Sequence, residues 1–282
     1  MNLAVFEAGG SKTEVVFGNP EKRRNLESAG IHPTFMDSQQ IGASLLEIRN
    51  QIPDFIPDKL FYYGASCGSH ELSWKVQEQL MQTFPRTEIS VESDLLGTAR
   101  ALCGRKAGFA AILGTGSNAC IFDGQKIQKR MLSFGFWLGD EGSGAYLGKK
   151  VFRAWLKGEV TEMYNESLEE LFQASRTNAL SELSEDKKPN ARIARLGGFA
   201  IRHKSDPVFK KIIRQSLEDF FTENDALLRE SVHLPFHFSG SVAFHLQDEI
   251  VEYLTGKQLT AGIFSSRTSE RLFEYHLLDL IL

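Results

Sequence analysis

The residues of this sequence best suited to chemistry begin with a glycine-rich turn near the N-terminus. Residues 9–13 join two apolar segments, residues 3–6 and 15–17, and this pattern predicts a β-hairpin. Glycines in such a turn leave backbone N–H groups open, and concave arrays of these groups bind anions, above all phosphate. The hydroxyls of Ser11 and Thr13 can add hydrogen-bond donors. The alternative is a plain tight turn, since glycine is the usual turn residue.

A second turn of the same kind lies at residues 114–118. It separates the apolar residues 109–113 from residues 119–122, and Gly116 matches Gly10 when the two hairpins are superposed. Two hairpins with the same turn chemistry, each opening a run of mixed structure, predict a duplicated domain. One turn from each copy could grip a polyphosphate from both sides.

Two better-known nucleotide motifs do not apply to these turns. Residues 114–119 fit the pattern G-x-G-x-x-A, but that fingerprint must open a helix, and a strand-like segment follows here. Lys12 and Thr13 resemble the end of a P-loop, yet Ser11 stands at the glycine position. Neither motif is therefore predicted.

Asp94 is a candidate catalytic carboxylate. It stands where the strand-like residues 88–91 give way to the helix-like residues 95–102. A carboxylate at the carboxyl end of a strand can act as a general base, because α/β sheets place their sites there. Local sequence alone favours the other interpretation, in which Asp94 caps the helix.

Two adjacent carboxylates, Asp140 and Glu141, stand in a glycine frame at residues 139–144 just before a predicted helix. A carboxylate that accepts two hydrogen bonds matches the paired hydroxyls of a sugar, and the aromatic residues nearby suit the apolar face of a sugar ring. The alternative is that Asp140 or Ser143 only caps the helix.

Strand-like and helix-like segments alternate in the first half, which indicates an α/β fold. The helix-like segments are residues 41–52, 72–84 and 95–102, and the strand-like segments are residues 59–63 and 88–91. Apolar stripes with the helical period predict helices at residues 146–156, 167–183, 207–230 and 269–282. A polar loop is expected at residues 184–190 and a short strand at residues 235–238.

Composition excludes several classes of function. Lys plus Arg number 32 and Asp plus Glu 36, a net charge of −4, whereas general nucleic-acid binding needs a basic surface. No apolar run reaches the ~18–20 residues of a membrane span, and the N-terminus lacks a signal-peptide pattern. Cys67, Cys103 and Cys120 show no C-x-x-C spacing, which favours a reducing compartment. We therefore expect a cytoplasmic protein with neither a nucleic-acid nor a membrane partner.

Five features occur together in a fixed order: the turn at residues 9–13, the Asp94 junction, and the motifs at residues 114–118, 139–144 and 240–243. In this order they resemble the N-acetylglucosamine kinase group of the BadF/BadG/BcrA/BcrD ATPase family. The parent superfamily holds the sugar kinases, Hsp70 and actin. The resemblance spans nearly the whole chain, and Gly-Thr-Gly-Ser-Asn and Gly-Asp-Glu-Gly-Ser-Gly are its specific motifs.

The resemblance implies an α/β fold of two ribonuclease-H-like (actin-like ATPase) lobes with a central cleft. The first lobe would comprise residues 1–103 plus 267–282, and the second would comprise residues 104–266 with a helical insertion. The inserted helices after Tyr146 could form the face of a homodimer.

The resemblance also implies roles for individual residues. Asp94 matches the catalytic base, which also contacts the sugar. Positions that match the ATP site are Gly9, Gly10, Ser11, Lys12, Thr13, Thr115, Gly116, Gly240, Ser241 and Ala243. Positions that match sugar contacts are His32, Ser117, Asn118, Phe134, Gly135 and Asp140. Mg²⁺ would bridge the ATP phosphates and be oriented by Glu7 through water.

The chain departs from the family pattern at several of these positions. The family usually has aspartate where Glu7 stands, asparagine where His32 stands and tryptophan where Phe134 stands. Near the C-terminus it often has a proline and a glycine, and residues 267–271 of this chain have neither. These departures bear on the choice of substrate and on the rate of the reaction more than on the fold.

The function implied is ATP-dependent phosphorylation of an amino sugar, with N-acetylglucosamine and its 6-phosphate as the first expectation. One alternative is a sugar or nucleotide sensor without turnover, supported by Glu7 and His32. The other is a BadF-type ATPase activator, which would hold an iron–sulfur cluster through cysteines, and the scattered cysteines here argue against it.

Overall fold

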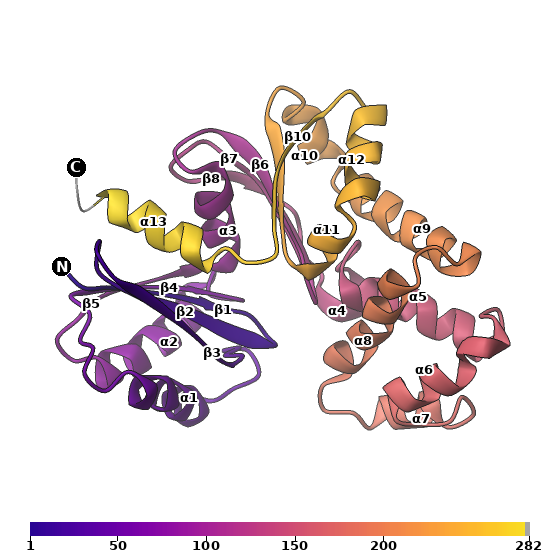
Figure 1. Cartoon of the computed structure of the whole chain (residues 1–282), viewed down its shortest axis with the longest axis horizontal. Helices are drawn as coiled ribbons and strands as arrows, with labels where there is room; N and C mark the ends of the chain where they lie inside the picture. The colour runs from indigo at the N-terminus through magenta and orange to yellow at the C-terminus, as the bar shows by residue number, and fades with distance from the viewer. Residues whose placement is uncertain (280–282) are drawn as a thin grey trace. The chain divides into compact units, whose positions relative to one another are not determined.

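The computed structural model describes residues 1–279 and divides the chain into two compact units (Figure 1). Unit 1 contains Met1–Lys106, Phe122–Ile127 and Arg267–Leu282, and unit 2 contains Ala107–Ile121 and Gln128–Ser266. Residues 280–282, which the sequence analysis assigned to the last helix and the first lobe, lie outside the described residues. Each unit contains a five-stranded sheet, so the predicted α/β class is confirmed.

The sheet of unit 1 has the strand order β3-β2-β1-β4-β5. Its strands are β1 (Leu3–Ala8), β2 (Lys12–Gly18), β3 (Arg23–Ala29), β4 (Lys59–Gly64) and β5 (Glu88–Ser93). The first three form an antiparallel meander, whereas β4 runs parallel to both β1 and β5. The predicted hairpin at the N-terminus is therefore present, and the parallel strands place their carboxyl ends at one edge of the sheet.

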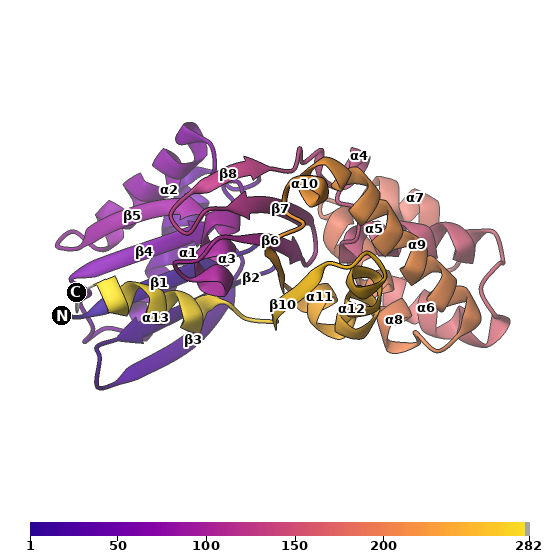
Figure 2. The ribbon, with the colours of Figure 1, turned by 90° about the horizontal axis from the view of Figure 1, so that it is seen from above.

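Alternation along β1 gives the sheet of unit 1 two apolar faces. Ala4 and Phe6 pack with α1 (Ser38–Gln51) and α2 (His70–Thr83). Leu3 and Val5 face the other way, toward α3 and α13. These two helices, α3 (Asp94–Cys103) and α13 (Ser269–Asp279), lie against each other (Figures 1 and 2). Burial on both faces explains the continuous apolar sequence of this strand.

The sheet of unit 2 has the strand order β10-β9-β6-β7-β8. Its strands are β6 (Gly108–Leu113), β7 (Ser117–Phe122), β8 (Ile127–Arg130), β9 (Pro235–Ser239) and β10 (Thr260–Ser265). Strands β6 and β7 are neighbours joined by a three-residue turn, so they are antiparallel, as the sequence predicted. Strand β9 runs parallel to both β6 and β10.

The helices of unit 2 are α4 (Gly135–Leu138), α5 (Gly144–Leu156), α6 (Asn165–Phe172), α7 (Ala179–Ser184), α8 (Pro189–Arg202), α9 (Pro207–Glu223), α10 (Asp225–Glu230), α11 (Ser241–His245) and α12 (Gln247–Gly256), with one 3-10 turn, Glu162–Tyr164. Helices α5 and α8 lie against each other (Figure 1), and glycines lie at their contact. A Cβ on Gly148 would lie 2.0 Å from the carbonyl oxygen of Ile193, and one on Gly197 would lie 2.2 Å from that of Gly144. Only glycine permits this backbone approach. Among residues 1–279, none of the helices combines the length and the apolar character needed to cross a membrane.

Two of the predicted helices are wrong as single helices. The predicted helix at residues 167–183 is two, α6 and α7, because Gln173 ends α6 with a left-handed φ of 60°. The predicted helix at residues 207–230 is divided at Asn224, whose side-chain Nδ2 donates to the carbonyl of Phe220 and competes with the backbone. The polar loop is shorter than expected, since α8 begins at Pro189.

Candidate functional site

The catalytic candidates of unit 1 gather at the carboxyl edge of its parallel strands. In the ladder, Ala8 pairs with Gly64 and Gly64 with Ser93. The residues that follow these positions, Gly9 and Asp94 among them, therefore leave the sheet at the same edge. Ligand sites of α/β sheets lie outside this edge.

The turn at residues 9–13 is packed against a second loop. The N–H of Gly9 donates to the carbonyl of Lys12 over 2.9 Å. A Cβ on Gly30 would lie 2.6 Å from backbone atoms of Gly10, and a Cβ on Gly10 would lie 3.4 Å from Cδ2 of His32. The structure thus brings His32 beside the turn. Burial lowers the pKa of His32, which favours a neutral imidazole there.

Asp94 is not the cap of α3. Ser93 holds the N-cap position, and its Oγ accepts from the N–H of Leu96 over 3.2 Å. The Asp94 carboxylate accepts from the N–H of Leu95 over 2.8 Å. The side chain is partly buried, and the loss of hydration raises its pKa to about 6. A carboxylate with this pKa can accept a proton near neutral pH.

Glu7, near the end of β1, has a second unusual carboxylate. Its Oε1 accepts a hydrogen bond from Thr268 Oγ1. Its Oε2 is buried and has no hydrogen-bond partner among residues 1–279. Burial, supported by the nearby charge of Glu14, raises the pKa of Glu7 to about 7.

The turn between β6 and β7 in unit 2 is fixed by the start of α5. Gly114 N–H donates to the carbonyl of Gly116 over 3.0 Å. The N–H groups of Gly144 and Ala145 donate to the carbonyls of Gly114 and Thr115 over 2.8 and 3.1 Å. The turn is therefore attached to α5, the helix that follows Asp140 and Glu141.

Asp140 lies over this same turn. Its φ of 64° is left-handed, and its Oδ1 accepts from the N–H of Ser117 over 3.4 Å. A Cβ on Gly116 would approach Oδ2 of Asp140 to 3.2 Å, so glycine leaves room for the carboxylate. Burial raises the pKa of Asp140. The helix itself is capped by Ser143 and not by Asp140, because Ser143 Oγ accepts from the N–H of Tyr146.

Gly240, the first residue of the motif at residues 240–243, lies beside the turn between β6 and β7. Its φ is 98°, and a Cβ there would lie 2.4 Å from the carbonyl oxygen of Leu113. The N–H of Gly240 donates to the carbonyl of Ser265 over 3.0 Å. The following Ser241 and Ala243 belong to the short helix α11, which contacts β6.

Phe134 and Gly135 lie at the start of α4 in a more exposed setting. Phe134 is 62% exposed, and Trp137 and Leu138 of the same segment are also exposed. Lys149, which the sequence analysis missed, donates from Nζ to the carbonyls of Phe136 and Gly139. A lysine is a common helix residue, so nothing in its sequence position signals this contact.

Buried polar atoms without partners mark several of the candidate residues. Within residues 1–279 they include Glu7 Oε2, Thr13 Oγ1, His32 Nδ1 and Ser117 Oγ. Buried polar groups are normally hydrogen-bonded, and an orphaned one calls for an explanation. A bound ligand with hydroxyl, phosphate or metal-bound water groups would supply the missing partners.

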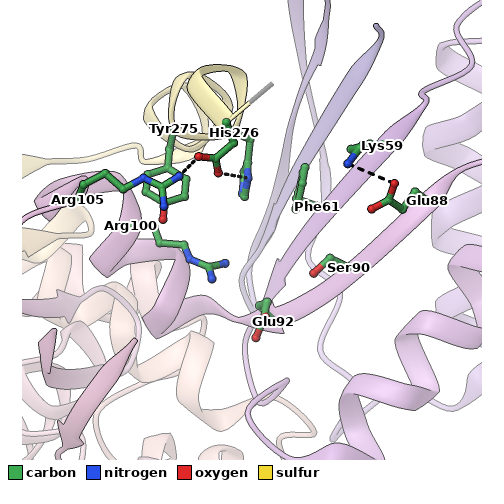
Figure 3. Close-up of a pocket in the computed structure, with 10 residues that line it drawn as sticks. Lys59, Phe61, Glu88, Ser90, Glu92, Arg100, Arg105, Tyr275 and His276 are labelled. Carbon is green, nitrogen blue, oxygen red and sulfur yellow. Dashed lines mark ion pairs between the residues drawn. The ribbon is translucent and has the colours of Figure 1, made fainter. Parts of the chain in front are cut away.

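A polar crevice of about 340 Å³ lies elsewhere on unit 1 (Figure 3). Its lining contains Arg100, Arg105, Tyr275 and His276, and none of the candidate site residues. We therefore do not assign the candidate chemistry to it.

The candidate residues are divided between the units. Those in unit 1 are Glu7, Gly9, Gly10, Ser11, Lys12, Thr13, His32 and Asp94. Those in unit 2 are Thr115, Gly116, Ser117, Asn118, Phe134, Gly135, Asp140, Gly240, Ser241 and Ala243. Thr268, which contacts Glu7, was missed because its partner is 261 residues away in the sequence.

Comparison with solved structures gives full-length matches. A provisionally named N-acetylglucosamine kinase from Porphyromonas gingivalis is 31% identical, with 99% of each chain covered and a TM-score of 0.92. A protein of the same provisional name from Chromobacterium violaceum is 19% identical over 97% of this chain and 98% of that one, with a TM-score of 0.75. A ROK family glucokinase from Streptomyces griseus, solved with glucose and AMPPNP, is 13% identical over 98% of each chain, with a TM-score of 0.58.

No protein-family model matches the chain, and no curated protein sequence does. The second and third structures share the fold, and the first shares substantial sequence as well. The chain therefore belongs to the N-acetylglucosamine kinase-like family that the Porphyromonas gingivalis protein represents.

Proposed function

We propose that this protein transfers the γ-phosphate of ATP to an amino sugar, with N-acetylglucosamine and its 6-phosphate as the substrate and product. The observation that carries the proposal is Asp94, a carboxylate that is not the N-cap of its helix and whose pKa is raised to about 6 at the carboxyl edge of the sheet. The name of the Porphyromonas gingivalis relative and the glucose and AMPPNP bound to the Streptomyces griseus glucokinase support the same reaction.

Asp94 is the general base in this proposal. Its carboxylate takes the proton of the sugar 6-hydroxyl while that oxygen attacks the γ-phosphorus, and ADP leaves with the electron pair of the broken P–O bond. Phosphoryl transfer depends mainly on positioning and on neutralising charge. A base of pKa about 6 is ionised at neutral pH, so Asp94 is ready to accept the proton.

The ATP contacts proposed in unit 1 are Gly9, Gly10, Ser11, Lys12 and Thr13. Those proposed in unit 2 are Thr115, Gly116, Gly240, Ser241 and Ala243. Backbone N–H groups of glycine turns suit phosphate oxygens, although those of Gly9 and Gly240 already donate to the carbonyls of Lys12 and Ser265. Thr13 Oγ1 is buried without a partner in the described chain.

The carboxylate of Glu7, in β1, suits a magnesium ion that accompanies those phosphates. Glu7 Oε2 is buried and has no hydrogen-bond partner within residues 1–279, and Mg²⁺ prefers oxygen ligands and retains several water molecules. Mg²⁺ neutralises phosphate charge when it is bound. Glu7 would accept hydrogen bonds from its water shell.

The sugar contacts that we propose, besides Asp94, are His32, Ser117, Asn118, Phe134, Gly135 and Asp140. Asp140 can accept two hydrogen bonds from neighbouring sugar hydroxyls. Ser117 Oγ and His32 Nδ1 have no hydrogen-bond partner within residues 1–279. They can therefore hydrogen-bond to other polar groups of the sugar.

The sensor hypothesis predicts that the same residues bind a sugar or a nucleotide and that no sugar phosphate is formed. The BadF-type hypothesis requires thiolate ligands for an iron–sulfur cluster. Burial raises the pKa of both Cys67 and Cys103 to about 12, which disfavours their thiolates, so we prefer the kinase.

Purified protein offered Mg-ATP with a panel of sugars separates these hypotheses. The panel contains N-acetylglucosamine, glucosamine, N-acetylmuramic acid and glucose. Sugar-dependent ADP release with formation of a sugar phosphate is expected. Sugar-independent release would favour the ATPase, and binding without release would favour the sensor.

Asp94→Asn tests the assigned base. It should lower kcat by about 10²–10⁴-fold, the usual contribution of a general base, without changing the circular dichroism spectrum. Asp54→Asn removes an exposed carboxylate of the same unit and should leave turnover unchanged. Sugar-dependent turnover that survives intact in Asp94→Asn would show that the base is assigned wrongly.

A further inference from the structure

Two glutamates stand directly opposite each other in the β1–β2 hairpin. Glu7 pairs with Glu14 in the ladder, and both side chains hydrogen-bond to the start of α13. Like charges directly opposite in a sheet are destabilising. Each carboxylate therefore needs its own compensating partners.

Glu14 has such partners. It is 7% exposed and forms ion pairs with Lys12 and Arg267. It also accepts a hydrogen bond from Ser269 Oγ over 2.8 Å. Two cations and one hydroxyl balance this carboxylate.

Glu7 has fewer compensating partners than Glu14. Thr268 Oγ1 donates to Oε1, while Oε2 is buried and has no hydrogen-bond partner among residues 1–279. The backbone N–H of Thr268 and the charge of Lys12 also stabilise the ionised carboxylate. Glu7 nevertheless retains an unsatisfied oxygen beside the glycine turn that begins at Gly9.

Thr268 is rigidly held for this contact. It is 1% exposed, and its carbonyl accepts the first helical hydrogen bond of α13 from Leu272 N over 2.9 Å, which places Thr268 at the N-cap position. The next residue, Ser269, is fixed to Glu14. The hydroxyl of Thr268 therefore has a defined position, set by the helix start.

We propose that Thr268 is a positioning residue for the metal of the nucleotide: its hydroxyl fixes Oε1 of Glu7 so that Oε2 stays available to the water shell of Mg²⁺. The inference rests on the proposed function. The proposal adds the N-cap residue of the last helix to the residues that act on the metal. It also explains how a glutamate, whose side chain is longer and more mobile than that of an aspartate, is kept in one orientation.

A merely structural role for Thr268 would predict a different outcome. The bond would then stabilise the docking of α13 and have no effect on the metal. Outer partners that orient a metal-binding group typically contribute 10–100-fold to metal affinity. The magnesium dependence of nucleotide binding therefore distinguishes the two roles.

The experiment measures the affinity of full-length protein for AMPPNP by calorimetry, with Mg²⁺ and with EDTA. Thr268→Val keeps the shape and removes the hydroxyl, and Thr268→Ala serves if that variant does not fold. Either should lower the gain in affinity due to Mg²⁺ by about tenfold or more. The metal-free affinity should change little, and Thr268→Ser should restore the gain.

Ser269→Ala is the matched control. It removes the adjacent hydroxyl, which binds Glu14, and should lower the melting temperature while leaving the gain due to Mg²⁺ unchanged. An unaltered gain in Thr268→Val and Thr268→Ala, or no restoration by Thr268→Ser, would overturn the role of Thr268 alone. A wild-type protein without sugar-dependent ADP release would instead overturn the proposed function.

Discussion

At the scale of single residues, the chemistry of Asp94 follows from what surrounds it. Burial is the largest cause of its raised pKa, and the N–H groups at the start of α3 oppose it. Ser93 satisfies the helix cap, while Asp94 Oδ1 accepts a hydrogen bond from the N–H of Leu95. Ser93 thus takes the N-cap position in place of Asp94, which we propose as the base.

The pH dependence of turnover should report this carboxylate. A general base works only when ionised, and the pKa of Asp94 is about 6 instead of the usual 3.8. We expect kcat/KM for the sugar to be level near pH 7.5 and to fall about tenfold per pH unit below pH 6. Steady-state rates between pH 5 and 8, with circular dichroism at each pH, measure this. A profile level down to pH 5 would contradict the assignment.

The residues of the site differ in how far the sequence alone could identify them. The glycine turns and Asp94 could be found because each motif is local and follows a strand. Whether Asp94 caps its helix could not be decided, because Ser93 is an equally good cap and the choice depends on backbone geometry. Thr268 could not be found at all, because its contact with Glu7 joins the two ends of the chain.

At the scale of elements, the crossing of α5 and α8 supports the turn between β6 and β7. Gly144 begins α5 and lies against Gly197 of α8, while its N–H holds the β6–β7 turn. The position of the turn therefore depends on a helix crossing without side chains at its centre.

Gly197→Ala and Gly198→Ala form a matched pair that tests this crossing. A Cβ on Gly197 would lie 2.2 Å from the carbonyl oxygen of Gly144, whereas one on Gly198 would meet only Arg202 Nη1 at 3.6 Å. Gly197→Ala should lower the free energy of unfolding by about 1–3 kcal/mol through overpacking. Gly198→Ala should raise it by up to about 1 kcal/mol through helix propensity. Urea unfolding measures both, and equal effects would refute a close crossing.

The glycines of this crossing also explain why the sequence did not reveal α8. Helix α8 has apolar residues at helical spacing, but two adjacent glycines and a first turn of Pro189 and Asn190 hide it. The edge strand β3 was also missed, because it is largely exposed and carries charged residues. The two buried hairpins were predicted correctly, because strands covered on both faces must be apolar throughout.

At the scale of the whole molecule, the last helix completes the unit that the first residues begin. Leu272 and Phe273 of α13 pack with Leu3 and Val5 of β1. His276 of the same helix stacks on Phe61 (Figure 3) at a centroid distance of 3.5 Å. It also hydrogen-bonds to Tyr63 Oη over 2.7 Å. Unit 1 therefore cannot form its complete core until the chain end is available.

His276 makes the stability of this closed unit sensitive to acid. Burial, together with the charges of Arg100 and Arg105, lowers its pKa from 6.5 to about 3, although Asp279 lies 4.0 Å away. Above pH 6.5 the imidazole is neutral in both the folded and the unfolded state, so its titration does not change the free energy of unfolding. Below pH 6.5 the unfolded chain binds a proton that the folded protein excludes, so stability falls as the pH falls toward 3.

Urea unfolding at pH 7.5 and pH 5 should show this loss. His276 accounts for about 2 kcal/mol between these two pH values, since each pH unit below 6.5 costs about 1.4 kcal/mol. His276→Gln keeps a hydrogen-bonding group near Tyr63 and should lose less stability than the wild type over the same interval. His233→Gln removes an exposed histidine and should behave like the wild type, because other titrating groups are common to all three proteins. Parallel losses in His276→Gln and the wild type would mean that α13 is not held by a neutral imidazole.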